Sequence, residues 1–236
     1  MLTFEEVMQQ LEQLSKERMK KIYMSNGAQE PLFGVTTGEM KPMRRQIKIN
    51  QPLAEQLYAT GNYDAMYFAG VIADPNAMTK DDYERWIDAA YFYMISDFVV
   101  AVTLSESDIA QEVADGWIAS GDELKMSAGW SCYCWLLGNR ADDQFKTEKL
   151  ARMLQVVERE IATAPERTKY SMSNFVFTTA VSYVPLHEEA TNTAVKISPL
   201  EIPQPKGKSK FLNAKENIDK ALARGQIGFK RKHVRC

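Results

Sequence analysis

The sequence lacks the residues and motifs on which several common catalytic sites depend. It contains only two histidines, His187 and His233, which disfavours a histidine-dependent nucleophilic triad and a histidine-rich metal centre. The three cysteines, Cys132, Cys134 and Cys236, predict neither a disulfide framework nor a zinc site. No glycine-rich phosphate loop, H-E-x-x-H helix or G-x-S-x-G elbow occurs. These absences argue against nucleotide hydrolases, metalloproteases and serine hydrolases, and we expect no metal and no cofactor.

Long apolar runs are absent as well. No stretch approaches the roughly 18 apolar residues that a membrane-spanning helix needs, and the chain opens with the acidic sequence M-L-T-F-E-E. We therefore expect a cytoplasmic protein with no membrane partner, and a monomer. With 236 residues, 45% of them hydrophobic and 25% charged, the chain is long enough for one sizeable core. We predict a single domain over residues 1–236.

Positive charge is scarce outside the C-terminal segment. Residues 206–236 contain ten Lys or Arg and two acidic residues, a net charge of +8, whereas the other 205 residues hold 19 basic and 29 acidic residues, a net charge of −10. Such a protein does not coat nucleic acid with its whole surface, so any contact with a polyanion must be local. The basic C-terminal segment is either a solvated tail or a binding element, and composition alone does not decide between them.

Helix signals dominate the pattern along the chain. Thr3 and Glu6 form a capping box ahead of an apolar stripe at helical spacing, which predicts a first helix ending at Asn26 and Gly27. Further helices are predicted at about 37–49, 50–61, 62–73, 79–89, 90–103, 107–120, 122–137, 144–163, 166–183, 185–195 and 213–224. Short turns between such helices indicate antiparallel pairs.

This pattern favours an all-α protein, an α-solenoid of paired helices, although a compact bundle gives a similar signal. Trp117, Trp130 and Trp135 lie on consecutive predicted helices, and we assign most of them to the core because large aromatic residues usually fill helix interfaces. Two short apolar runs flank Ser198 and Pro199 and predict a β-hairpin near residues 195–202.

One carboxylate lies at the end of a dense aromatic stretch, Y-E-R-W-I-D-A-A-Y-F-Y-M-I-S-D-F, at residues 83–98. An ionised Asp97 in this apolar setting is costly to bury unless a cation, a hydrogen-bond donor or a cationic reaction intermediate compensates it. The neighbouring rings suit flat, electron-poor ligands such as nucleobases. Asp97 is therefore either a functional carboxylate or a structural one that bonds to a neighbouring helix terminus.

A row of four basic residues recurs at spacings of three and four within one predicted helix, and its members are Lys41, Arg44, Arg45 and Lys48. Residues at these spacings share one helix face. Such a row can contact successive phosphates of a nucleic acid without reading its sequence. Four basic residues on a solvated helix face, with no ligand, are an equally common arrangement.

Several segments together resemble the DNA alkylation repair family of HEAT-like repeat proteins. They are L-F-G-V-T-T-G-E-M-K-P-M-R (32–44), N-Y-D-A-M-Y-F-A-G-V-I (62–72), W-I-D-A-A-Y-F-Y-M-I-S-D (86–97), A-G-W-S-C-Y-C-W-L-L (128–137), S-Y-V-P-L-H-E-E-A-T-N-T-A-V-K-I (182–197) and the basic ending F-K-R-K-H-V-R-C. The resemblance spans most of the chain. It implies an α-solenoid whose concave, basic face grips duplex DNA, and an activity that excises N3- or N7-alkylated purines.

The resemblance also assigns residues and reveals departures. The W-x-x-x-D pattern of active members falls on Tyr93 and Asp97, so the catalytic carboxylate is kept and the indole is replaced by a phenol. The arginine of the following helical pair is replaced near Ser127 or Ala128, and a late-helix tryptophan falls at Thr178. These changes remove rings that hold the lesion and one phosphate contact.

Our leading hypothesis is a bacterial DNA-binding protein of this family that acts in DNA repair or DNA-structure recognition, with glycosylase activity reduced or absent. An active DNA glycosylase that uses Asp97 as electrostatic catalyst, with Tyr93 in place of the lost tryptophan, is the alternative; a carboxylate near the developing oxocarbenium sugar supplies the useful electrostatics. A protein-binding helical scaffold is the second alternative. The expected partner is DNA, and the expected DNA-binding residues are Lys41, Arg44, Arg45, Lys48, Lys206, Lys208, Lys210, Lys230, Arg231 and Lys232.

Overall fold

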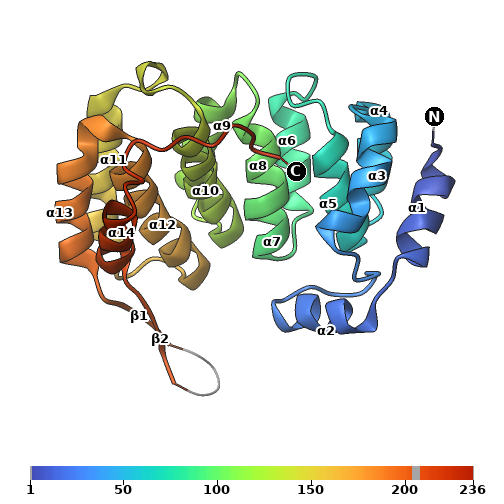
Figure 1. Ribbon diagram of the computed structural model, residues 1–236, viewed down its shortest axis with the longest axis horizontal. Coiled ribbons are helices and arrows are strands. Elements are labelled where there is room, and N and C mark those ends of the chain that lie inside the picture. Colours follow the sequence, from blue (N-terminus) through green and yellow to red (C-terminus); the bar gives the residue numbers. More distant parts are fainter. Residues whose placement is uncertain (1, 204–207, 236) are drawn as a thin grey trace. The chain divides into compact units, whose positions relative to one another are not determined.

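The computed structural model describes residues 2–203 and 208–235, and most of them lie in helices (Figure 1). The α-helices are α1 (Phe4–Gln13), α2 (Glu17–Ser25), α3 (Thr37–Ile47), α4 (Gln51–Tyr58), α5 (Tyr63–Ile72), α6 (Lys80–Asp88), α7 (Tyr93–Ile95), α8 (Ala101–Ser105), α9 (Ala110–Ile118), α10 (Glu123–Asn139), α11 (Thr147–Glu160), α12 (Glu166–Ser182), α13 (His187–Ile197) and α14 (Ala214–Ala223). A π-helical turn, η1 (Ser96–Val100), and two 3-10 turns, η2 (Asp142–Gln144) and η3 (Val184–Leu186), accompany them. The strands are β1 (Leu200–Ile202) and β2 (Lys210–Leu212).

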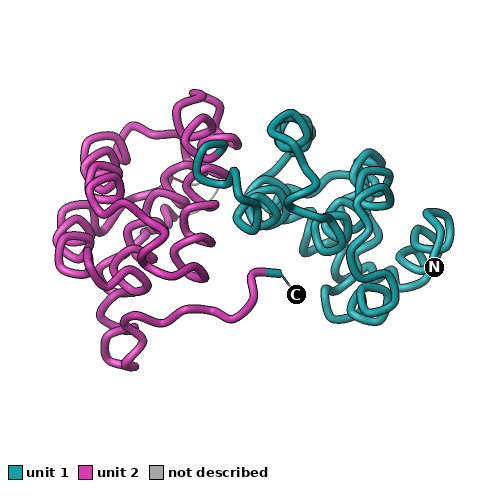
Figure 2. Tube along the Cα trace, turned by 90° about the horizontal axis from the view of Figure 1, so that it is seen from above, with its two compact units in different colours: residues 1–113, 235–236 teal, residues 114–234 magenta. Residues whose placement is uncertain are grey.

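The helices pack side by side as successive pairs, which confirms the predicted all-α, solenoid-type fold with a small hairpin. Contacts divide the chain into two compact units, which Figure 2 colours separately. Unit 1 comprises residues 1–113 and 235–236, and unit 2 comprises residues 114–234, so the boundary falls within α9. The single domain expected from the sequence stays a prediction. None of the described helices combines the length and the apolar character needed to cross a membrane.

The predicted first helix is two helices in unit 1. The capping box of Thr3 and Glu6 is present and begins α1, as predicted. The helix ends at Gln13, however, because the next residues bond to a loop far along the chain. The Ser15 hydroxyl donates to the carbonyl oxygen of Phe33 at 2.7 Å, and the backbone N–H of Lys16 donates to the same oxygen at 3.1 Å. These tertiary bonds separate α1 from α2.

A buried carboxylate in unit 1 fixes the loop that leads into α3. Asp64 is fully buried in α5, and its two oxygens accept the backbone N–H groups of Phe33, Gly34 and Val35 at 2.6, 2.9 and 2.7 Å. Burial raises the pKa of Asp64 above its ordinary value of 3.8, and the three amide donors offset part of that effect by favouring the carboxylate. Gly34 has a φ of 76°, and a Cβ atom there would lie 2.6 Å from the carbonyl oxygen of Lys16. The loop therefore requires glycine.

The core of unit 2 forms where α10 packs on α12. Trp117 and Trp130 are each only 1% exposed, and the Trp130 ring lies 5.0 Å from that of Phe175, so both indoles belong to the core as predicted. Gly129 lets α10 approach α9 closely, because a Cβ atom there would lie 2.7 Å from the carbonyl oxygen of Ala114. Large rings and a glycine contact together define this interface.

The hairpin is present in unit 2, but its strands differ from the predicted ones. β1 pairs antiparallel with β2, with Leu200 opposite Leu212 and Ile202 opposite Lys210. Residues 195–197, which the sequence pattern assigned to the hairpin, are instead the last turn of α13. They stay helical because Ile197 continues the buried face of that helix.

The basic C-terminal segment is largely folded onto unit 2. Its helix α14 buries Ile218, and the chain beyond it forms hydrogen bonds with the ends of α10 and α12. The Gly228 N–H donates to the carbonyl oxygen of Val181 at 2.7 Å, and the Arg231 N–H donates to that of Gly138 at 2.7 Å. Much of the segment is therefore not a solvated tail, and its role as a binding element stays a prediction.

Helix α3 begins with a charged cap in unit 1. Glu39 accepts hydrogen bonds from the N–H and hydroxyl of Thr36, at 3.2 and 2.7 Å, and its other oxygen lies 2.6 Å from the ammonium of Lys16. The bond from Lys16, followed by that from Thr36, lowers the pKa of Glu39 from 4.5 to about 2. The carboxylate therefore contributes to stability at pH values above 4.5.

We predict that the free energy of unfolding decreases as the pH is lowered from about 5 towards 2. This decrease should be smaller in Glu39→Gln, because the variant lacks the titrating carboxylate. The sign follows from linkage: a carboxylate with a lowered folded pKa stabilises above its unfolded pKa, and that stabilisation disappears as pH falls through the folded value. Denaturant unfolding at a series of pH values measures it. An identical pH dependence in the native protein and in Glu39→Gln would contradict the assignment.

Candidate nucleic-acid interface

Helix α3 presents the predicted row of cations on its outward face in unit 1. The side chains that α3 buries are Met40, Met43 and Ile47. The row comprises exposed Lys41, Arg45 and Lys48 and half-buried Arg44. Within α3, Lys41, Arg44 and Arg45 therefore lie on a different face from the apolar stripe, whereas Lys48 follows the end of the helix. Two of the cations lie in its last turn, where positive charge also interacts favourably with the helix dipole.

None of the four cations of the α3 row pairs with an acidic residue of the described chain. Within residues 2–203 and 208–235, no carboxylate forms an ion pair with any of them. Other cations are paired: Lys149 lies 2.6 Å from Asp115, and Lys196 lies 2.8 Å from Glu158. The Nε atom of Arg44 is enclosed and has no hydrogen-bond partner among the described residues. The row therefore offers uncompensated positive charge to an external anion.

The last cation of the α3 row has a strained backbone. Lys48 follows α3 with φ 63° and ψ −122°, and it is the one non-glycine residue of the described chain with a positive φ. These angles resemble those of the first central residue of a type II′ turn, a position dominated by glycine. A side chain there costs roughly 1–3 kcal/mol. Such outliers are worth a functional hypothesis, and here the strained residue ends a row of unpaired charges.

The proposed catalytic residues lie in a helical segment with an unusual turn. The predicted helix over 90–103 is interrupted: α7 passes into the π-helical η1 and then into α8. Asp97 is in η1 and only 1% exposed, and one of its oxygens accepts a hydrogen bond from the Ser96 hydroxyl at 2.9 Å. Tyr93 is half-buried, and its hydroxyl donates to Asn26 at 3.3 Å. π-helical turns are frequent at functional sites.

The positions at which the sequence departs from the family pattern hold small side chains in unit 2. Ser127 and Ala128 in α10 are fully buried, and Thr178 in α12 is half-buried. An arginine at either α10 position would have to displace packed neighbours, because no exposed surface remains there. The expectation that one phosphate contact is missing stays a prediction.

The remaining predicted DNA-binding residues belong to unit 2 and differ in their surroundings. Lys208 and Lys210 lie at the hairpin and are exposed, next to Phe211, which is 61% exposed. Lys232 is exposed, whereas the Lys230 ammonium donates to the carbonyl oxygen of Leu137 and pairs with Asp142, both at 2.7 Å. The Arg231 guanidinium lies 5.2 Å from the ring of Trp135. Lys206 lies outside the described residues.

The sequence patterns thus singled out two separate groups of residues, the α3 row and the turn that contains Asp97, and both lie in unit 1. The patterns missed Asp64, whose carboxylate sets the loop before α3, although Asp64 lies within the quoted segment 62–72. An acidic residue in an otherwise apolar helix was the available signal. No group of three or more His, Cys, Asp or Glu side chains suited to a metal ion occurs among the residues that the structure describes.

Comparison with known proteins places these features in a class of DNA repair proteins built from paired helices. The family model described as DNA alkylation repair enzyme matches residues 7–197. The chain belongs to this family. Two relatives are the uncharacterized protein Lin0241 of Listeria innocua and the uncharacterized protein Lmo0209 of Listeria monocytogenes. Each is 28% identical to the chain, over 230 and 229 residues, and each match covers 95% of this chain and 99% of the relative.

A solved structure is much more similar. It is 65% identical in sequence, covers 100% of both chains and superimposes with a TM-score of 0.97. It is described as representing a new family of proteins related to the HEAT-like repeat DNA glycosylases with affinity for branched DNA structures. The present chain therefore has the HEAT-like repeat fold that the sequence resemblance implied.

We predict that Lys48→Gly raises the unfolding free energy relative to Lys48→Ala by about 1–2 kcal/mol. Both variants remove the ammonium, but only glycine adopts a positive φ without steric cost, so the difference isolates the backbone strain. Denaturant unfolding of the two variants under one set of conditions measures it. Equal stabilities would show that the turn at Lys48 is not strained.

Proposed function

We propose that the protein binds DNA, with preference for branched forms, and that the α3 row contacts the phosphate backbone. The observation that carries the proposal is the row itself: three cations on α3 and a fourth directly after it, all without carboxylate partners in the described chain. Family membership supports a DNA substrate. The solved structure at 65% identity, described as having affinity for branched DNA, supports the preference for branched forms.

The length of the row fits a run of phosphates. Lys41 and Arg45 are four residues apart in α3, which corresponds to roughly 6 Å along the helix axis, and Lys48 follows the end of the helix. Successive phosphates of one strand rise by about 3.4 Å, so the helical part of the row extends over about two nucleotides. Contacts of this kind give affinity without sequence preference, which is what recognition of DNA shape requires.

We propose further that base excision is reduced or absent. Asp97 is only 1% exposed and accepts a hydrogen bond from Ser96, so its carboxylate is largely withdrawn from solvent, where a DNA sugar would have to approach. Tyr93 replaces the tryptophan of active members and bonds to Asn26. With a phenol in place of an indole, the segment that carries Asp97 offers a smaller ring for positioning a lesion.

Charge reversal in the α3 row tests the binding proposal. We predict that Lys41→Glu/Arg45→Glu weakens binding to a four-way DNA junction. The negative slope of log affinity against log salt should become shallower by about 2, roughly one for each lost phosphate contact. These two residues are chosen because both are exposed, whereas Arg44 is half-buried. Fluorescence anisotropy at several salt concentrations, with a linear duplex of matching sequence alongside, measures affinity, slope and preference.

The matched control is Lys146→Glu/Arg152→Glu. Both residues are exposed on or beside α11 and have no ion-pair partner among the described residues, so the control changes net charge equally. Lys149 is unsuitable because its ammonium holds Asp115. Equal loss in both double variants would show that the effect is general electrostatics. No binding to any DNA at low salt would favour a protein partner instead.

Lys48→Gly separates binding from folding. This variant is expected to be more stable than Lys48→Ala, yet both should bind the junction equally weakly because both lack the ammonium. If Lys48→Gly is stably folded and still binds the junction weakly, unfolding cannot explain its loss of affinity.

Retention of Asp97 keeps the glycosylase alternative testable. We predict that the native protein releases little or no free base from DNA carrying 7-methylguanine or 3-methyladenine, and that Asp97→Asn binds the junction as the native protein does. Chromatography of released bases measures excision. Base release by the native protein that disappears in Asp97→Asn would establish the enzyme and overturn the binding-only interpretation.

A further inference from the structure

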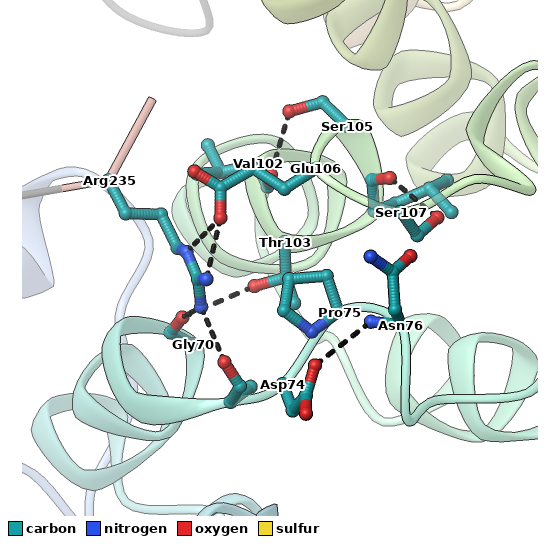
Figure 3. Close-up of polar contacts among 12 residues, drawn as sticks. Gly70, Asp74, Pro75, Asn76, Val102, Thr103, Ser105, Glu106, Ser107 and Arg235 are labelled. Atoms are coloured by element: carbon teal, nitrogen blue, oxygen red, sulfur yellow. Dashed lines mark hydrogen bonds and ion pairs between the residues drawn. The ribbon is translucent and has the colours of Figure 1, made fainter. Parts of the chain in front are cut away.

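Arg235 occupies a partly buried position in unit 1, far in sequence from everything it contacts (Figure 3). Its side chain is 12% exposed. Its Nη1 donates to the carbonyl oxygens of Gly70 and Ala73, both at 2.8 Å, and its Nε donates to Glu106 at 2.6 Å. Its Nη2 also pairs with the Glu106 carboxylate. All three guanidinium nitrogens are therefore engaged.

The carbonyl groups that Arg235 binds belong to the C-terminal end of α5. The last carbonyls of a helix have no partner within the helix. That of Ile72 accepts the N–H of Asn50 at 2.8 Å, and Arg235 satisfies those of Gly70 and Ala73. A guanidinium at this end also interacts favourably with the helix dipole. Arg235 thus completes the end of α5.

The carboxylate that Arg235 binds follows directly after α8. Glu106 is the residue after Ser105, and the helical segment that ends there contains Asp97 in η1. This segment packs closely on α5, because a Cβ atom at Gly70 would lie 2.7 Å from Val99. The Thr103 hydroxyl also lies 3.4 Å from the Gly70 carbonyl oxygen. Arg235 therefore contacts both helices at the ends where they meet.

We propose that Arg235 is a positioning residue that clamps the C-terminal ends of α5 and α8 together and so holds the η1 turn with Asp97 in its packed conformation. A surface ion pair would not do this, because exposed pairs contribute little. Here one planar cation bonds to two backbone carbonyl groups and one carboxylate with little solvent access. Lysine cannot replace this geometry, since an ammonium is a point charge.

Hydrogen exchange of the full-length protein without DNA tests the clamp. In Arg235→Ala we expect amides at 71–74 and 96–107 to exchange at least about tenfold faster, because hydrogen bonds to charged groups oppose local opening. Amides of α3 in the same unit should keep their native rates. Arg235→Lys should resemble Arg235→Ala. The control Arg224→Ala, which removes an exposed charge with no ion-pair partner in the described chain, should leave all segments unchanged.

Chemical rescue distinguishes positioning from general stabilisation. Millimolar N-ethylguanidinium should restore slow exchange at 96–107 in Arg235→Ala, whereas ethylammonium should not, because only the guanidinium reproduces the donor geometry. Glu106→Gln, which retains an acceptor, should give an intermediate rate and serves if Arg235→Ala folds poorly. Native rates at 71–74 and 96–107, or equally faster exchange throughout α3, would overturn the proposal. Since no DNA is present, failure of the proposed DNA binding leaves this result intact.

Discussion

The buried Asp64 carboxylate is the contact on which the arrangement of unit 1 depends. It binds three consecutive amides of a loop about thirty residues earlier, and removing it would leave those buried N–H groups without partners. The same loop supplies the Phe33 carbonyl that ends the α1 region and leads through Gly34 into α3. The hydrogen bonds of Asp64 therefore fix the loop from which α3 begins, and through it the helix that carries the cation row.

The α3 row combines two properties: its cations are close together in sequence, and none of them has a carboxylate partner in the described chain, whereas unpaired cations elsewhere, such as Lys146 and Arg152, do not form such a row. The chain has 29 basic and 31 acidic residues, and many of its cations are held by carboxylates, as Lys149 is by Asp115. Pairing of this kind satisfies both charges and leaves little field for a ligand. Lys41 and Arg45 have no such partner in the described chain and lie on a helix that is itself capped by Glu39. Glu39 lies in the first turn of the helix and Arg44 and Arg45 in its last turn, so the carboxylate that caps the helix does not neutralise these cations.

Local signals predicted local features, and contacts between distant residues account for most of what differed. The capping box at Thr3, the paired helices and the buried Trp117 and Trp130 follow from short-range patterns. The break after α1 could not be predicted, because it depends on a bond between Ser15 and Phe33. The π-helical turn at Asp97 could not be predicted either, because the segment around it is mostly apolar and its hydrophobic pattern has no clear period. The strands were misplaced for a related reason, since residues 195–197 fit a strand by alternation but bury Ile197 as a helix. In the candidate site, spacing predicted the row but not the backbone strain at Lys48, which depends on how the chain turns after α3.

The position of Arg235 in sequence has a consequence for the order of events during synthesis. Glu106 and Arg235 are 129 residues apart, and Gly70 and Arg235 are 165 apart. At about 5–20 residues per second, a ribosome needs roughly 6 to 26 seconds to translate from one member of the ion pair to the other. Throughout that interval the nascent unit 1 lacks the guanidinium that binds the carbonyl groups of Gly70 and Ala73. A chaperone would meet it in this incomplete form, because the cation that closes it is translated 129 residues after Glu106.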